Sequence, residues 1–282
     1  MRMISIFAWA LAVAVRCSAG TLPDDPRLFP VLISHEHGMG SGCLLRVSNS
    51  VYLATAKHVL FSMPEGTSAP ALLSGNASVR AYSRAGTTNV SDRTILLDLA
   101  QLLSLGEIRY STNRDVALVR FEDCNTNDYH IVRVLPGVLI TSSGGGLWPI
   151  EGNWLGKQRD VDVGAEVYMF GYPVSLTGPI REIFDPAEPL LRRGIVAGVN
   201  VGKRSIIIDC PAYLGNSGGP VIQVLHPALD VTSYQVIGLV SGFVPFQEEW
   251  ENKTLRYSHV LKSNSGYTVV EPIDIAIELV WK

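Results

Sequence analysis

The stretch Leu214-Gly215-Asn216-Ser217-Gly218-Gly219-Pro220 decides the interpretation of this chain. It is a loop of small residues that presents one serine. Glycines on both sides leave the Ser217 hydroxyl uncovered and permit backbone conformations that a Cβ forbids. Such a loop can turn its own N–H groups toward one point, as stabilisation of an oxyanion requires. Ordinary turns share the pattern, so its meaning depends on residues elsewhere.

Two upstream segments carry the groups that a nucleophilic serine needs. Residues 51–56 form an apolar, β-branched run that leads into small residues, and His58 follows after Lys57. Residues 114–121 place Asp115 at the start of a buried-looking strand. Taken alone, His58 would be interpreted as a surface histidine and Asp115 as a carboxylate at the edge of a strand. Together with the glycine-rich loop, the order His58, Asp115, Ser217 indicates a base and an orienting carboxylate for the serine.

The three segments resemble the signatures of the trypsin-like (chymotrypsin-fold) serine proteases. Residues 40–42, 171–173, 193–196 and 266–274 make the chain most similar to the bacterial HtrA/Deg-type branch. The resemblance covers residues 38–62, 112–121 and 160–280 and is weak over 64–110. It implies an all-β fold of two six-stranded antiparallel β-barrels with a short C-terminal helix. We expect no PDZ domain after that helix.

The resemblance also implies roles for individual residues. Ser217 is the expected nucleophile, His58 the general base and Asp115 the carboxylate that orients the imidazole. The backbone N–H groups of Gly215 and Ser217 are the expected oxyanion hole. The implied activity is a serine endopeptidase that acts through an acyl-enzyme intermediate. The alternative is a binding or stress-sensing protein of the same fold whose site is latent or inactive.

Gly215 to Gly219 also fit Gly-x-Ser-x-Gly, the nucleophile elbow of α/β-hydrolases. In that elbow the serine leads directly into a helix, and its partners follow it in the chain. Here a proline and a β-branched run follow Ser217, and no motif frames the later histidines. The sequence therefore argues against the esterase reading.

Asn216 departs from the resembled family. Secreted animal members carry aspartate at this position, where it pairs with the new N-terminal amine that zymogen cleavage creates. An amide cannot form that ion pair, so we expect the protein to need no activating cut beyond removal of its leader.

Specificity is expected to be non-tryptic. Pro211 occupies the position where trypsin-type enzymes carry the acidic residue that selects Lys or Arg. A basic substrate side chain would lose its hydration there without gaining a partner. The segment Ser241-Gly242-Phe243 resembles the strand that pairs with the substrate backbone, and Gly266 corresponds to the opposite pocket wall.

Composition indicates a globular protein with a substantial core. The chain has 282 residues, of which 47% are hydrophobic and 17% charged, and its net charge is −3. This balance offers no electrostatic case for nucleic acid or anionic membranes, so polypeptide substrates are the expected partners. We expect no metal or cofactor; the pair of histidines around Glu36 is read as an exposed polar turn.

The N-terminus predicts a secretory signal peptide over residues 1–19. Met1-Arg2-Met3, with its one basic residue, precedes about twelve apolar residues, and a small-residue exit follows. The expected location is therefore extracellular or periplasmic, without stable membrane association after cleavage. Cys17 would leave with the signal, and three cysteines, Cys43, Cys124 and Cys210, would remain. They allow one disulfide at most, and the sequence does not choose the pair.

Short β-branched runs separated by Gly, Pro, Asn and Ser predict most of the chain as strands. We expect a first barrel at 20–140 with His58 and Asp115, a linker at 141–155 and a second barrel at 156–282 with Ser217. Residues 64–110 read as an insertion of unassigned role with helical character at 95–105. The expected strands span 43–47, 51–55, 116–121, 131–135, 167–170, 195–199, 205–209, 221–224, 236–240 and 267–271.

Overall fold

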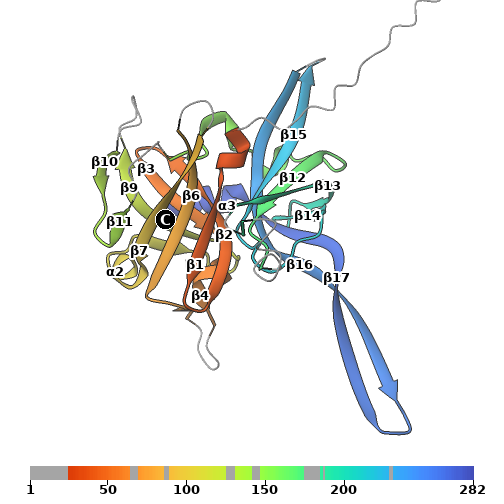
Figure 1. The fold of residues 1–282 in the computed structure, drawn as a ribbon. Helices are drawn as coiled ribbons and strands as arrows, with labels where there is room; N and C mark the ends of the chain where they lie inside the picture. The colour runs from red at the N-terminus through yellow and green to blue at the C-terminus, as the bar shows by residue number, and fades with distance from the viewer. Residues whose placement is uncertain are drawn as a thin grey trace, which may run out of the picture.

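The computed structural model describes residues 25–63, 69–85, 89–124, 131–141, 147–174, 185–186, 188–228 and 231–282. The predicted signal segment 1–19 and residues 142–146 of the predicted linker lie outside these ranges. Two antiparallel sheets lie side by side, and a short C-terminal helix packs on both (Figure 1). The predicted mostly-β, chymotrypsin-like fold is confirmed.

The first sheet has nine strands in the order β10-β9-β3-β2-β1-β6-β7-β11, with β8 paired to β9. It is a half-barrel and differs from the closed six-stranded barrel that we expected. The difference comes from residues 64–110, which supply β6, β7 and β8 and so form part of the sheet rather than a separate insertion. Its strands are β1 Pro30–His35, β2 Gly38–Val47, β3 Ser50–Thr55, β6 Asn76–Ala85, β7 Asn89–Asp98, β8 Ile108–Tyr110, β9 Ala117–Cys124, β10 Ile131–Val134 and β11 Val138–Ile140.

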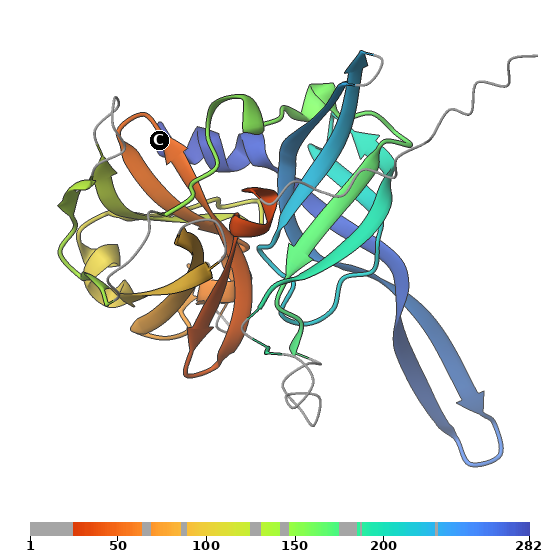
Figure 2. The same cartoon turned by 45° about the horizontal axis from the view of Figure 1, so that its top comes forward.

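The second sheet closes into the expected six-stranded barrel, in the order β12-β13-β14-β17-β16-β15. Its last two strands continue beyond the barrel as a two-stranded ribbon, which projects into solvent in both views (Figures 1 and 2). The strands are β12 Glu166–Gly171, β13 Leu190–Asn200, β14 Ser205–Asp209, β15 Pro220–Ala228, β16 Val231–Asn252 and β17 Tyr257–Pro272.

Short elements complete the described fold. The helix expected over 95–105 is only Leu99–Ser104 (α2), because residues 95–98 extend β7 and pair with β6 and β11. Asp98 ends that strand and caps the helix, since its Oδ1 accepts a bond from the N–H of Gln101 at 2.8 Å. The others are η1 Asp25–Leu28, α1 Lys57–Leu60, β4 Phe61–Ser62, β5 Ala71–Leu72, η2 Gly152–Trp154, η3 Gln158–Asp160 and α3 Ile273–Val280.

Strands β3 and β9 are buried on both faces. Alternate residues of β3, such as Val51 and Leu53, point into the core of the first sheet. The others, Tyr52 and Ala54, join a second cluster with Phe170 and further residues of the second barrel and α3. Burial on both faces removes the freedom of a strand to tilt. The ends of β3 and β9 are therefore fixed relative to the second barrel.

Helix α3 packs across the junction of the two sheets. Ile273, Ala276 and Leu279 recur at helical spacing on one face and are buried in the shared core. From the first sheet, the Arg109 guanidinium donates to the carbonyls of Leu279 and Val280 at the end of the helix. A cation at this end satisfies carbonyls that lack helical partners. The helix thus ties the second barrel to the first sheet.

The three described cysteines are free thiols. Cys124 lies in the core of the first sheet, Cys43 in the junction core and Cys210 in the core of the second barrel. Burial raises the pKa of each thiol, that of Cys210 to about 11. They act as small apolar side chains, because a protonated, covered thiol is a poor nucleophile.

Glu122 is a buried acid at the far end of β9. It is 3% exposed, and its Oε2 has no hydrogen-bond partner among the described residues. Burial raises the pKa of Glu122 to about 7, although the positive charge of Arg93 opposes the shift. The folded state therefore holds the proton more tightly than the unfolded state, and stability contributed by this proton falls as pH rises through about 7.

Replacement of this acid tests that account. Glu122→Gln is expected to raise the free energy of unfolding by about 1–3 kcal/mol at pH 8 and to change it little at pH 4. Denaturant titrations at both pH values measure the two differences. Glu36→Gln, at an exposed acid, is the control and should change neither. An equal effect of Glu122→Gln at both pH values would contradict the buried-charge explanation.

Among the described residues, no helix is long and apolar enough to cross a membrane.

Candidate active site

His58 and Asp115 meet where β3 and β9 end. His58 follows β3 at the start of α1, and Asp115 precedes β9, whose pairing of Ala117 with Thr55 brings the two ends together. Asp115 Oδ2 lies 2.7 Å from His58 Nδ1, and Asp115 Oδ1 accepts the His58 N–H at 3.0 Å. A carboxylate can only accept, so Nδ1 carries the proton and Nε2 is the free base.

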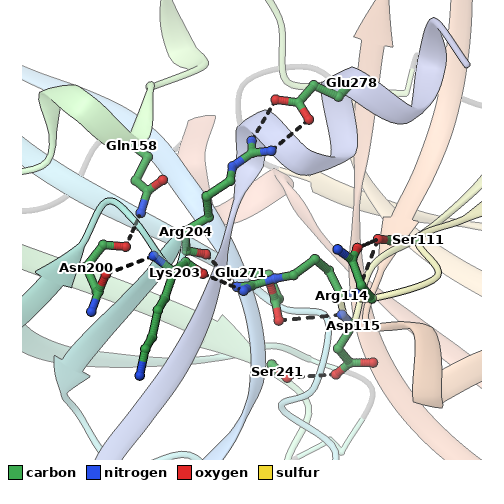
Figure 3. A network of polar contacts seen from close by, with 11 residues as sticks. Ser111, Arg114, Asp115, Gln158, Asn200, Lys203, Arg204, Ser241, Glu271 and Glu278 are labelled. Carbon is green, nitrogen blue, oxygen red and sulfur yellow. Dashed lines mark hydrogen bonds and ion pairs between the residues drawn. The ribbon is translucent and has the colours of Figure 1, made fainter.

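Further donors surround the Asp115 carboxylate. Ser241 Oγ donates to Asp115 Oδ2 at 2.7 Å from the second barrel (Figure 3). Burial alone raises the pKa of Asp115, but the bonds from His58 and Ser241 outweigh it and hold the pKa below its usual range. The aspartate is therefore ionised at neutral pH. This anion fixes the tautomer and orientation of the imidazole.

A charged network behind Asp115 joins the two halves. Arg114 pairs with Glu271 of β17 at 2.6 Å, and Glu271 Oε1 accepts the Asp115 N–H at 3.5 Å. Arg114 also donates to the carbonyls of Lys203 and Arg204 in the turn between β13 and β14 (Figure 3). Glu271 is 6% exposed, so removing its partner would leave a buried charge. No sequence pattern indicates this pair, because its members are 157 residues apart.

The loop that carries Ser217 lies between the two sheets. Gly218 N–H donates to Val240 O at 2.7 Å, and Ser217 O accepts the N–H of Ser41 from the first sheet at 2.8 Å. A Cβ on Gly218 would lie 2.1 Å from Ser41 O, so only glycine permits this approach. The loop is held to both halves, which places Ser217 beside the ends of β3 and β9.

Gly215 and Ser217 present the N–H groups expected to form the oxyanion hole. Gly215 has φ +95°, and a Cβ there would lie 2.2 Å from Tyr172 O. Neither N–H donates to an acceptor among the described residues, whereas the intervening Asn216 N–H is bound to Tyr213 O at 3.0 Å. The N–H groups of Gly215 and of Ser217 itself are therefore both available to a developing oxyanion.

The Ser217 hydroxyl is turned toward the second barrel. Ser217 Oγ donates to Ser241 O at 3.4 Å, a weak bond. Within the described part of the chain, no hydrogen bond joins Ser217 Oγ to His58. Rotation about the Cα–Cβ bond moves a serine hydroxyl between staggered positions, and catalytic bonds of unliganded enzymes often form only with substrate.

The side chain of Asn216 is buried beneath the loop that carries Ser217. It is 1% exposed, and its Oδ1 has no partner among the described residues. The side chain lies against Gly171, where a Cβ would be 2.8 Å from Asn216 Nδ2. A neutral amide tolerates this position far better than a carboxylate, which would be buried without a described cation.

Ser41 is a site residue whose role the sequence did not reveal. Its side chain is fully buried and donates to Gly215 O at 2.6 Å, while it accepts the N–H of Tyr172 at 3.0 Å. The hydroxyl thus links the serine loop to β2 and to the segment after β12. The only sequence signal was its position between two glycines before the histidine strand.

Loss of this hydroxyl should disturb the loop. Ser41→Ala leaves two buried backbone groups unpaired, and we expect about 1–3 kcal/mol lower stability. Well below the melting temperature, we expect kcat to fall about 10–100-fold with KM nearly unchanged, because the oxyanion donors shift. Ser104→Ala, at an exposed helical serine, is the matched control. A stability loss with normal kcat would show that Ser41 does not position the loop.

Pro211 and Gly266 lie on two segments that face each other. Thr268 Oγ1 donates to Cys210 O at 2.6 Å and accepts the Ala212 N–H at 3.0 Å, which joins the segment around Pro211 to β17. Gly266 has φ +90° and open space at its Cβ position. On the neighbouring strand, Gly242 and Phe243 continue β16 from Ser241. Of the residues expected for substrate binding, Ser241 contacts Ser217 directly, through its carbonyl.

The polar turn around Glu36 contacts the helix that carries His58. His35 Nε2 lies 2.9 Å from Val59 O, so this ring packs against α1. No group of three His, Cys, Asp or Glu able to hold a metal occurs within the ranges that the structure describes.

Residues 40–226 match the trypsin-like peptidase domain family, and the chain belongs to that family. The matched region contains His58, Asp115 and Ser217. No curated relative matches the chain. Among solved structures, it is similar to the crystal structure of Deg5, with 17% identity, TM-score 0.49 and coverage of 90% of this chain and 88% of that chain. It is also similar to the serine endoprotease from Yersinia pestis, with 14% identity, TM-score 0.46 and coverage of 93% and 66%.

Proposed function

We propose that this member of the trypsin-like peptidase family is a serine endopeptidase whose triad is Ser217, His58 and Asp115. The observation that carries the proposal is the junction of the two sheets. There, an ionised Asp115 orients His58, and a loop held to both sheets presents Ser217 with two unpaired N–H groups, its own and that of Gly215.

The proposed reaction starts with rotation of the Ser217 hydroxyl from Ser241 O toward His58 Nε2. Ser217 Oγ attacks the substrate carbonyl carbon while its proton passes to Nε2, and the carbonyl oxygen takes up negative charge beside the N–H groups of Gly215 and Ser217. The amine leaves with the proton from Nε2, and an acyl-enzyme remains. Water then repeats the sequence, again with His58 as base, and regenerates Ser217. Asp115 stays ionised and stabilises the imidazolium.

Specificity is proposed to be for apolar rather than basic side chains. The segment from Cys210 to Ala212 contains no charged residue, so nothing there offers a partner to a buried Lys or Arg. Cleavage of a peptide library, read by mass spectrometry, tests this. We expect small or medium apolar residues before the scissile bond. A dominant preference for Lys or Arg would overturn the proposed specificity and leave the proposed triad intact.

We also propose that the protein is exported by residues 1–19 and needs no further cut. The buried, neutral Asn216 supports the second point, because it offers no carboxylate to a new N-terminal amine. Protein that begins at residue 20 should be fully active without trimming. Activity that appears only after a defined later cleavage would overturn this. Export is tested separately, by fractionation of cells that express the whole chain.

The rotamer of Ser217 favours one alternative, a site that rests inactive and acts only with an activator. Assays with and without unfolded protein or peptides separate the alternatives. A site that is competent at rest is active in both conditions, and a latent site needs the addition.

A further inference from the structure

The ribbon formed by residues 245–264 is a long hairpin outside the barrel. Its register runs from the pair Pro245–Asn264 to the pair Asn252–Tyr257 (Figures 1 and 2). The described fold does not need these residues for its core, because the barrel pairings of β16 and β17 end before the ribbon begins. Its place in the chain, directly after Phe243, connects it to the proposed active site.

One edge of β16 is unpaired from the active site into the ribbon. Its pairing with β15 ends at Leu239, and Val240 is bound to Gly218 and Gly219 of the serine loop. Ser241 O comes next and receives the Ser217 hydroxyl. Beyond this point, no strand among the described residues pairs with that edge, while β17 pairs with the opposite one. An unpaired edge is a template for another strand.

Beyond a bulge at Ser241, the backbone of β16 continues without another extra residue into the ribbon. The second irregularity, between Phe243 and Pro245, lies in β17, where Ser265, Gly266 and Tyr267 are extra residues opposite Val244. Val244 O points toward β17, because it accepts a bond from Ser265 Oγ at 2.7 Å. Strand backbones alternate in direction, so Phe243, Pro245, Gln247 and every second residue after them aim at the free edge. A proline at such a position removes no bond between β16 and β17.

The ribbon has an apolar face along this edge. The register puts Phe246, Trp250, Tyr257 and Leu261 on one face, where they are 54%, 63%, 56% and 46% exposed. Glu248 and His259 lie among them on the same face. The other face is more polar and carries Gln247, Glu249, Glu251 and Lys262 with one apolar residue, Val260. No described residue covers the aromatic side chains of the first face in the folded chain. A strand added to the edge of β16 would set alternate side chains beside Phe246 and Trp250.

We infer that the ribbon extends the substrate-binding edge, so that unfolded polypeptide with alternating apolar residues adds to β16 as an antiparallel strand. This rests on the proposed function. The scissile bond of the bound substrate lies beside Ser217. The substrate strand is antiparallel to β16, as β15 and β17 are, so its amino-terminal side lies along the ribbon. At about 3.4 Å per residue, the edge from Ser241 to Trp250 accommodates roughly ten substrate residues.

Peptides of graded length test the inference. All share one cleavage sequence and are extended by two to eight residues, with alternating apolar side chains, on the amino side or on the carboxyl side. For the wild type, amino-side extension should raise kcat/KM by about tenfold or more, since backbone bonds and apolar contacts are added. In a variant with Asn-Gly in place of residues 246–263, the gain should vanish while the shortest peptide is cleaved normally. Carboxyl-side extension should change kcat/KM equally in the wild type and in the variant without the ribbon.

Point variants distinguish backbone pairing of the substrate with β16 from side-chain contact with the ribbon. Gln247→Pro removes an N–H on the free edge without removing a bond to β17, and Gln247→Ala keeps that N–H. Only the proline variant should lose much of the length effect. Phe246→Ser and Trp250→Ser should reduce the gain for apolar extensions but not for polar ones.

Three outcomes would overturn the inference. In the first, kcat/KM of the wild type does not depend on peptide length. In the second, amino-side extension raises kcat/KM equally after the ribbon has been removed. The third is a ribbon-dependent change of oligomeric state with an unchanged length effect, which would assign the ribbon to contact between copies. Failure of the proposed function is distinct, because then no peptide of any length is cleaved by wild type or variant.

Discussion

Replacement of Ser217 by alanine is expected to lower kcat for peptide hydrolysis by on the order of 10⁶-fold. The alanine removes the only atom that can form the acyl-enzyme, while the loop contacts made by Gly218 and by Ser217 O are backbone bonds and survive. Active-site titration and steady-state kinetics on a short peptide measure the loss. Circular dichroism and the melting temperature should remain those of the wild type.

Ser104→Ala is the matched control for this experiment. It makes the same chemical change at an exposed serine of α2 on the first sheet, and its kcat should equal that of the wild type. Residual activity of Ser217→Ala within tenfold of the wild type would show that another group supplies the nucleophile, and the proposed triad would then be wrong.

Replacement of Asp115 by asparagine is expected to lower kcat about 10⁴-fold. Three donors, His58 N–H, His58 Nδ1–H and Ser241 Oγ–H, converge on the carboxylate. The amide of asparagine has only one acceptor oxygen, so its NH₂ group must face one of these three donors. If it faces His58 Nδ1, that nitrogen becomes the acceptor and the imidazole adopts the tautomer whose Nε2 carries the proton. That tautomer cannot accept the serine proton. Asp123→Asn, at a carboxylate paired with Arg120 on β9, is the control and should leave kcat unchanged.

The stability of Asp115→Asn should depend on pH with a definite sign. The pKa of Asp115 is lower in the folded protein than its usual value. The stability from its ionised bonds is therefore fully present above about pH 4 and is lost as pH falls through the folded-state pKa. The wild type should exceed the variant in melting temperature at pH 7, and the gap should narrow at pH 3. A constant gap would mean that the carboxylate is not stabilised by its donors.

Much of the fold followed from the sequence because its strongest signals are local. The expected strands at 51–55, 116–121 and 205–209 match β3, β9 and β14 within about three residues at each end. Buried strands with continuous apolar runs carry such a signal. The polar strands β6 and β7 do not, since buried residues alternate with more exposed ones where their side chains are described, at 76–81 and 93–98, and residues 64–110 were therefore interpreted as an insertion. The ribbon was missed for the same reason, because acidic residues alternate with its aromatic ones.

The candidate site was predictable where residue type and spacing are diagnostic. His58, Asp115 and Ser217 were named from three short segments, and the structure brings all three to the junction of the sheets. Ser41, Arg114 and Glu271 were assigned no role, because their contacts cross between sheets that are far apart in the chain. The resting direction of Ser217 Oγ is a property of side-chain rotation, which no sequence pattern encodes.

Covalent labelling tests the central claim most directly. A fluorophosphonate probe is added to protein that begins at residue 20, to Ser217→Ala and to Ser104→Ala, and each is read by intact mass and peptide mapping. One adduct on Ser217 in the first and third proteins, and none in the second, is the result that an activated triad predicts. An adduct on another residue, or none on any protein with or without added peptide, would contradict the account.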